Sequence, residues 1–253
     1  MWAALTGQVH DAIFTDPPTR CSASIRHELA AANVTTLRFE HLTVENAPAV
    51  AALLVRGFAH SPLVQASGQD TSNRPKNFLR ICDEIARAEA ETQRPVSIVC
   101  YCGETVVAAI HVRPPAPVAS KDTVKNEWTA SNRLSGCLAY TMETQNGRGR
   151  RATLDLPELS LTTVDPAFRG TLVDSQGVKQ SLYQRMVAAA EHEAAKYWRG
   201  IFSISNDISA ARHIQDKWTV VVRLPYSEFP PQLIVDQTID GAVNICVHEF
   251  DRP

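Results

Sequence analysis

Glu158 and Ser160 have residue types and a spacing that could support acid–base chemistry. They lie two positions apart in a run typical of a β-strand, so both side chains would lie on one face of that strand. A glutamate whose pKa is raised by partial burial is an effective proton acceptor near neutral pH. The sequence therefore offers Glu158 as a candidate general base. A solvated glutamate at the start of a strand is the alternative.

His60 and Ser61 form a second candidate for the same chemistry, at the start of a polar loop over residues 61–75. An unperturbed imidazole has a pKa of about 6.5 and can accept a proton near neutral pH. A serine hydroxyl has little basicity unless a neighbour activates it, so His60 is the better acceptor of the two. A surface histidine in a loop is the alternative interpretation.

The elements that would position these residues alternate between strands and helices. Apolar spacing predicts strands over 35–39, 96–102, 105–112, 159–164, 200–204, 219–224 and 242–250. It predicts helices over 43–58, 78–94, 177–198 and 208–217, and an irregular 118–153 segment with a short helix near 126–138. This order indicates an α/β (α+β) fold with a single mixed, mostly antiparallel central sheet flanked by helices. We expect an N-terminal extension over residues 1–33 and one domain over 34–253.

Composition excludes several classes of protein. The chain has 253 residues, 44% of them hydrophobic and 21% charged, which is too apolar for a disordered segment. Its 25 Lys and Arg against 27 Asp and Glu give a net charge of −2, which argues against a nucleic-acid partner. The six cysteines form no CxxC pair, so we expect reduced thiols and no metal. The start of the chain does not resemble a signal peptide, and no run predicts a membrane span, so we expect a cytoplasmic protein. We also expect it to be a monomer or a weak dimer.

Three segments carry a resemblance to a known family. They are LSLTTVDPAFRG at 159–170, SISNDISAARHIQDKW at 203–218 followed by PYSEF at 225–229, and GFAHSPL at 57–63. Together with the order of elements, they resemble the GNAT superfamily of N-acetyltransferases. The likeness is greatest to the invertebrate arylalkylamine (dopamine) N-acetyltransferases. In these enzymes an amine attacks the thioester of acetyl-CoA.

The resemblance implies a binding site for acetyl-CoA as co-substrate. Backbone amides at a helix N-terminus bind phosphate, and the helix expected from Gly177 would supply them. A simple strand–loop–helix turn is the alternative. The family has one residue between two glycines where this chain has six, from Thr171 to Gln176. The implied cofactor-binding residues are Thr162, Thr163, Val164, Arg169, Gly170, Thr171, Gly177, Val178, Lys179 and Asn206.

The resemblance also implies roles for residues near the acceptor amine and the CoA sulfur. Ser205 and Ser209 match the family's paired serines, which are implicated in proton transfer to the thiolate. Ser205 and Asn206 also fit ordinary helix caps. Ser160 and Tyr226 are implied to bind the amine, and a half-buried aromatic at a strand end is the alternative for Tyr226. Ser61 replaces the family's glutamate in its E-P-L segment, which leaves Glu158 or His60 as the base.

The sequence thus predicts acetyl transfer from acetyl-CoA to a small, arylalkyl amine. Two alternatives stay open. One is a GNAT-like protein with impaired catalysis, a pseudoenzyme or binding module. The other is an N-acyltransferase for a non-aromatic amine such as a polyamine or an amino acid.

Overall fold

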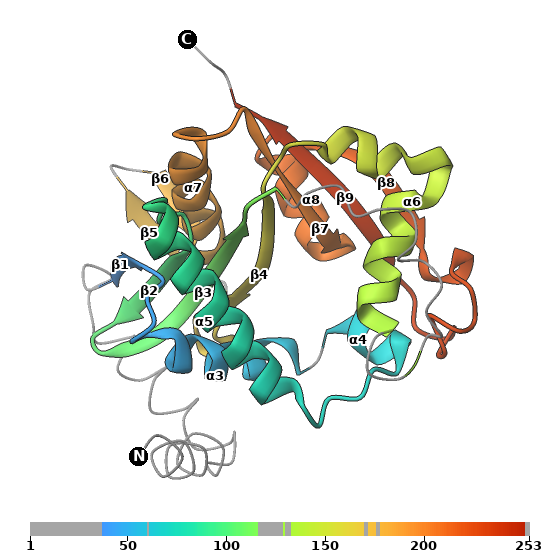
Figure 1. Ribbon diagram of the computed structural model, residues 1–253, viewed down its shortest axis with the longest axis horizontal. Helices are drawn as coiled ribbons and strands as arrows, with labels where there is room; N and C mark the ends of the chain where they lie inside the picture. Colours follow the sequence, from blue (N-terminus) through green and yellow to red (C-terminus); the bar gives the residue numbers. More distant parts are fainter. Residues whose placement is uncertain are drawn as a thin grey trace.

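The computed structural model describes residues 37–59, 61–115, 129, 133–169, 172–175 and 178–250 (Figure 1). The strands are β1 (Leu37–His41), β2 (Ile98–Cys102), β3 (Thr105–Arg113), β4 (Glu158–Val164), β5 (Leu172–Ser175), β6 (Val178–Ser181), β7 (Gly200–Asn206), β8 (Thr219–Pro225) and β9 (Ala242–Glu249). The helices are α3 (Ala47–Phe58), α4 (Pro62–Ser67), α5 (Arg74–Thr92), α6 (Arg133–Thr153), α7 (Leu182–Ala195) and α8 (Asp207–Gln215), with 3-10 turns at Pro166–Phe168 and Tyr226–Glu228.

Seven strands form one sheet in the order β1-β2-β3-β4-β7-β9-β8. Every neighbouring pair is antiparallel except β4 and β7, which run parallel. These are the seven strands predicted from the sequence. The expected single mixed, mostly antiparallel sheet flanked by helices is therefore confirmed.

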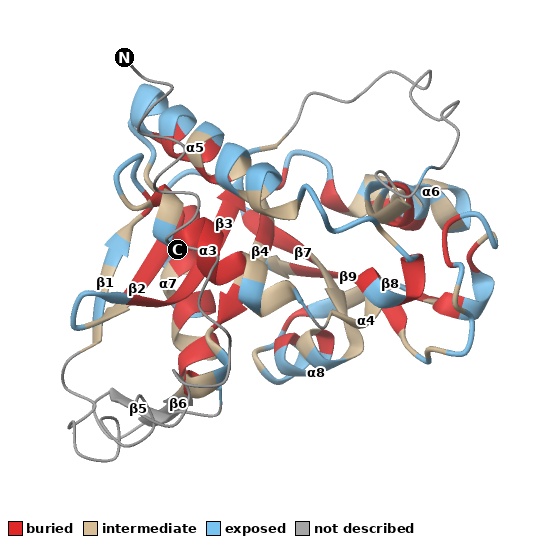
Figure 2. Cartoon of the chain, turned by 90° about the horizontal axis from the view of Figure 1, so that it is seen from below, coloured by how far each residue is buried: buried red, intermediate tan, exposed pale blue. Residues whose placement is uncertain are grey.

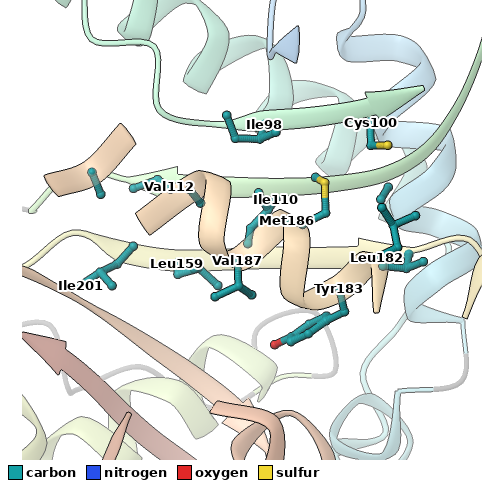
Figure 3. Packing of buried hydrophobic residues seen from close by; sticks show 14 of the residues in the cluster. Ile98, Cys100, Ile110, Val112, Leu159, Leu182, Tyr183, Met186, Val187 and Ile201 are labelled. Atoms are coloured by element: carbon teal, nitrogen blue, oxygen red, sulfur yellow. The ribbon is translucent and has the colours of Figure 1, made fainter. Parts of the chain in front are cut away.

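The helices cover the sheet in two layers (Figure 2). α3, α5 and α6 lie on one face, and α7 and α8 lie on the other. α7 packs its apolar stripe against the middle strands, where Met186 and Val187 lie over Ile110 and Leu159 (Figure 3). Because these side chains are 2% exposed or less, their burial is a main source of the free energy that holds α7 on the sheet.

α7 begins later than the sequence predicts, at Leu182 rather than near Gly177. Val178 lies four residues before Leu182, so the helical spacing of apolar residues extended the predicted helix by one turn. Residues 178–181 instead pair with 172–175 as the hairpin β5–β6. The family has one residue where this chain has six, from Thr171 to Gln176. Of these six, residues 172–175 therefore belong to a small β-hairpin.

Two segments expected to be irregular contain helices. Residues 61–75 were predicted as a loop but include α4, which ends at Gly68 in the left-handed region at φ 57°. The 118–153 segment includes α6, far longer than the short helix expected there. α6 is broken at Thr144, which is extended, and at residues 145–147, which are left-handed. α4 has only six residues and α6 contains a long polar run, so neither shows the repeated apolar stripe through which periodicity detects a helix.

Ser181 sets the start of α7 through a capping box. Its hydroxyl accepts a hydrogen bond from the Gln184 N–H at 3.3 Å, and the Gln184 side chain accepts one from the Ser181 N–H at 3.2 Å. We expect Ser181→Ala to lower the free energy of unfolding by about 1 kcal/mol in urea titrations, because one amide of the first turn loses its acceptor. Ser227→Ala, at an exposed serine, is the control and should change stability by less than about 0.5 kcal/mol. Equal stabilities of the two variants would contradict the cap.

Candidate active site at the opening between β4 and β7

The sheet opens at its centre, where β4 and β7 separate. Within these two fully described strands, the single paired position joins Glu158 to Phe202, next to a hydrogen bond from the Phe202 N–H to the Pro157 carbonyl at 3.0 Å. Beyond that point the strands diverge toward their C-terminal ends (Figure 1). Buried backbone N–H and C=O groups rarely stay unpaired, so facing edges without mutual pairing are suited to a ligand that supplies the missing partners.

A β-bulge shapes the β4 side of this opening. Ala109 pairs with Thr163 and His111 pairs with Ser160, so β4 carries one residue more than β3 between these pairs. Leu161, within the bulge, has a φ of 46°, a left-handed value unusual for leucine. Bulges redirect side chains and occur often beside active sites.

Ser160 and Thr163 both point to the face covered by α3 and α5. Thr163 lies directly against Gly57 of α3, where a Cβ atom would collide with the threonine hydroxyl. Val164, the next residue, packs in the cluster under α7 on the opposite face. The buried Oγ of Ser160 and Oγ1 of Thr162 find no hydrogen-bond partner among the described residues. Such hydroxyls are usually satisfied by water or by a ligand.

Glu158 stands where the opening begins. Its side chain is 19% exposed, and its Oε2 lies 3.6 Å from Nη1 of Arg113. Burial raises the pKa of Glu158, and the Arg113 guanidinium partly offsets this effect. The structure therefore shows a partly buried carboxyl group rather than the solvated glutamate that was the alternative, and its role as a base stays a prediction.

His111 is a polar residue of this region that no sequence motif singled out. It is 1% exposed, it faces Ser160 across the β3–β4 pair, and its Nε2 lies 3.6 Å from the Cys82 thiol. Burial lowers the pKa of His111 to about 4, so the imidazole is neutral at physiological pH. Only the register between β3 and β4 brings it beside Ser160, and that register is not visible in the sequence.

The end of β4 leads into the expected phosphate loop. Asp165 caps the 3-10 turn by accepting a hydrogen bond from the Ala167 N–H at 2.9 Å, and it pairs with Arg56 at 3.4 Å. The exposed Arg169 donates to the carbonyls of Val164 and Gly57, both at 3.3 Å, and so ties β4 to α3. The predictions for His60, Gly170, Thr171 and Gly177 lie outside the described residues. Val178 and Lys179 are described as backbone of β6.

The β7 side of the opening carries Ser205, Asn206 and Ser209. Asn206 caps α8, because its Oδ1 accepts a hydrogen bond from the Ser209 N–H at 2.9 Å. Ser205 lies with its Oγ 3.8 Å from the Cys246 sulfur, toward the α7 and α8 face. The predicted cap is confirmed for Asn206, which leaves its side-chain oxygen engaged with α8.

Tyr226 is more deeply buried than either sequence interpretation expected. It is 2% exposed and packs with Cys137 of α6 and Phe229, and Gly241 lies against its ring. Burial raises the pKa of Tyr226 to about 12, and the negative charge of Asp207 acts in the same direction. Its ring forms part of a core on the α4 and α6 side of the sheet.

The structure thus brings the candidate residues into two groups. Glu158, Ser160 and Thr163 lie on the face covered by α3 and α5, and Ser205 and Ser209 lie toward α7 and α8. The two groups thus lie on opposite faces of the sheet, on either side of the divergence between β4 and β7. In the part of the chain that the structure describes, no cluster of three His, Cys, Asp or Glu residues could hold a metal ion. No described helix has the length and apolar character to cross a bilayer.

Solved structures share this fold. A mosquito arylalkylamine N-acetyltransferase-like protein (5b) matches with a TM-score of 0.64 at 14% identity, over 85% of this chain and 100% of its own. The Drosophila melanogaster polyamine N-acetyltransferase, which catalyses the formation of N-acetylagmatine, matches at 0.63 and 15% over the same shares. The yncA protein of Salmonella typhimurium, solved with its cofactor acetyl-CoA, matches at 0.52 and 13%, over 86% of this chain and 96% of its own.

The comparisons identify the class of fold. The seven-stranded sheet with one parallel contact at its centre is the fold of GNAT N-acetyltransferases, as the sequence resemblance implied. Within that class, the structural likeness includes insect enzymes named for arylalkylamines and for polyamines. No family model and no curated protein matches the sequence itself.

Proposed function

We propose that this protein transfers an acetyl group from acetyl-CoA to the primary amine of a small arylalkyl amine. The observation that carries the proposal is the opening between β4 and β7, with a buried carboxylate on one face and two serines toward the other. An amine on the Glu158 side and a thioester on the Ser209 side could meet there without either crossing the core.

The described residues can divide the chemistry between them. Glu158 takes the proton that the amine nitrogen loses as its bond to the acetyl carbon forms. Unpaired backbone groups of β4 hold the pantetheine arm by hydrogen bonds, and the buried hydroxyls of Ser160 and Thr162 supply further partners. Ser209 donates a proton to the sulfur as the carbon–sulfur bond breaks, and its oxygen regains a proton from solvent as the products leave.

An apolar cluster on the α4 and α6 side of the sheet, against which Ile204 of β7 packs, supports an arylalkyl acceptor. α4 and α6 turn Ala66 and Cys137 toward Tyr226, and Tyr140 contacts Phe229 with ring centroids 5.5 Å apart. An aromatic amine could use such contacts, whereas a polyamine needs a second anionic partner for its distal charge.

Impaired catalysis is the second candidate function. Arg169 is tied to two carbonyls, and the capping box of Ser181 already satisfies one amide of the first turn of α7. Both features reduce the donors left for a pyrophosphate, so they favour a protein that binds CoA weakly. Affinity for acetyl-CoA separates this candidate from the enzyme.

The test combines binding with turnover. We expect saturable binding of acetyl-CoA by calorimetry, and release of free thiol when tyramine, dopamine or serotonin is added. Spermine and agmatine are the comparison amines and should react more slowly. Absence of acetyl-CoA binding at millimolar concentration would contradict the enzyme, and faster turnover with spermine or agmatine would contradict the arylalkyl acceptor.

A further inference from the structure

His111 is a buried polar residue in a strand that is otherwise apolar from Val106 to Val112. Its neighbours Ile110 and Val112 point toward α7 (Figure 3), so the imidazole lies on the opposite face, under α5. There Nε2 lies 3.6 Å from the Cys82 thiol, and Nδ1 has no hydrogen-bond partner among the described residues. A thiol is a weak partner, and burying an imidazole without strong hydrogen bonds costs free energy. Packing alone therefore does not explain an imidazole at this position.

Ser160 is a second buried polar group without a partner, and it lies opposite His111. The two residues pair across β3 and β4, which places their Cβ atoms on one face of the sheet, about 5 Å apart. Ser160 is 8% exposed and His111 is 1% exposed, and in the described part of the chain neither the Ser160 Oγ nor the His111 Nδ1 has a hydrogen-bond partner. Unpaired buried polar groups are rare, so two of them facing each other indicate a site for a ligand that pairs with both.

A hydroxyl group matches the hydrogen-bonding capacity of this pair. Burial lowers the pKa of His111 to about 4, against a smaller effect of the Leu161 carbonyl, so the ring is neutral. Nδ1 then donates or accepts according to the tautomer, and the Ser160 hydroxyl can do both. A ligand hydroxyl donates one hydrogen and accepts at two lone pairs, so it satisfies both groups in either tautomer. The positive charge of Arg113, which also lowers the pKa of His111, disfavours a cationic ligand group at this point.

Glu158 determines how far this hydroxyl lies from the reacting amine. It precedes Ser160 by two residues on the same face of β4, so their Cα atoms are about 6.6 Å apart. An acceptor whose amine meets the Glu158 carboxyl group must therefore carry the hydroxyl a short distance from its nitrogen. A hydroxyl on the carbon next to the aminomethyl group lies within this distance. A hydroxyl on the far side of an aromatic ring lies farther from the nitrogen than two strand residues span.

We propose that His111 and Ser160 bind the hydroxyl group of an acceptor that carries this hydroxyl on the carbon next to the aminomethyl group, which makes the acceptor a vicinal amino alcohol. The inference rests on the proposed function and narrows its class of acceptor. Ser160 has one hydrogen and two lone pairs, so it can pair with this hydroxyl and with the pantetheine arm together. Both polar atoms are closed to solvent, so the acceptor reaches them when a neighbouring side chain moves, and Leu161 is half-buried in the bulge beside Ser160.

Pairs of acceptors that differ only in this hydroxyl test the proposal. Phenylethanolamine is compared with phenylethylamine, and octopamine with tyramine, by initial rates of thiol release. We expect kcat/KM to be about 10- to 100-fold higher for the amino alcohol of each pair, because the amine without the hydroxyl leaves two buried polar groups unpaired. One enantiomer of each amino alcohol should react faster than the other, because His111 and Ser160 lie on one face of the sheet.

Variants of His111 connect this preference to the imidazole. His111→Leu should reduce the ratio of kcat/KM between phenylethanolamine and phenylethylamine to within about threefold. His111→Asn keeps a hydrogen-bonding atom near the place of Nδ1 and should retain part of the ratio. His192→Leu, at an exposed histidine of α7, is the matched control and should keep the full ratio. Because the ratio compares two acceptors on one protein sample, partial unfolding of a variant does not change it.

The outcomes separate this inference from the proposed function. If the wild-type protein acetylates both amines of each pair at similar rates, His111 and Ser160 bind water only, and the proposed function stands. A preference for tyramine over phenylethylamine without one for phenylethanolamine would place the recognised hydroxyl on the ring and overturn the inference. A preference for amino alcohols that persists in His111→Leu would assign the recognition to other residues. If the wild-type protein acetylates none of these amines, both the proposed acceptor and this inference are wrong.

Discussion

Glu158→Gln is expected to lower kcat for acetyl transfer about 100-fold or more, because glutamine has the shape of glutamate but cannot take the amine proton. Glu158 lies at the position where β4 and β7 cease to pair, and its side chain is 19% exposed. Burial raises the pKa of this carboxyl, which brings its basicity closer to that of a catalyst working near neutral pH. Steady-state rates of thiol release measure the effect.

The matched control is Glu84→Gln, at an exposed glutamate paired with Arg80, and it should leave kcat unchanged. The pH profile gives a second readout. kcat/KM should rise with pH as Glu158 loses its proton, and this limb should disappear in Glu158→Gln. Arg113→Gln removes the positive charge that holds the pKa of Glu158 down, so the limb should move to higher pH.

The alternative base is tested in parallel. His60→Ala should leave kcat within about threefold if Glu158 is the base, since a general base contributes far more than that. A large loss in His60→Ala together with full activity in Glu158→Gln would reverse the assignment.

Local sequence patterns predicted the strands because the strands are buried. Residues 96–112 form two β-prone runs around Gly103, and they fold as β2 and β3 with Gly103 in the left-handed region at φ 57°. The strand predicted over 159–164 is β4, which begins one residue earlier at Glu158. Burial imposes a period on each strand separately, so one strand can be recognised without knowing its neighbours.

Local sequence patterns could not predict the features that depend on pairing between segments far apart in the chain. The bulge at Leu161 arises from the register between β3 and β4, and the same register places His111 opposite Ser160. Tyr183 lies within the predicted helix, and only the folded chain brings His213 of α8 to 3.3 Å from its hydroxyl. Chemistry that needs two elements to meet is decided by tertiary structure.

Glu89→Ala is expected to lower the free energy of unfolding by about 3–5 kcal/mol, because it leaves buried hydrogen-bond donors without an acceptor. Glu89, in α5, is 3% exposed and accepts hydrogen bonds from the N–H groups of Val96 at 3.1 Å and Ser97 at 3.0 Å. The Ser97 hydroxyl donates a third hydrogen bond to the Glu89 carboxyl group, at 2.5 Å. The same Ser97 oxygen accepts a hydrogen bond from the Val112 N–H at 3.1 Å. One carboxyl group thus joins α5 to the residues just before β2 and, through Ser97, to β3.

The same carboxyl group should make stability depend on pH. Burial raises the pKa of Glu89 from its ordinary 4.5 to about 7, against hydrogen bonds from Ser97 and Val96 that lower it. Between these values the folded chain keeps a proton that the unfolded chain has lost, so stability falls as pH rises from 4.5 to 7 and then levels off. Glu89→Gln keeps one acceptor oxygen and has no proton to titrate, so urea titrations should show a smaller loss than for alanine and a shallower slope in that window. If stability in Glu89→Gln depends on pH as steeply as in the wild type, other groups cause the pH dependence. If Glu89→Ala is within about 1 kcal/mol of the wild-type stability, the carboxyl group does not hold α5 to the sheet.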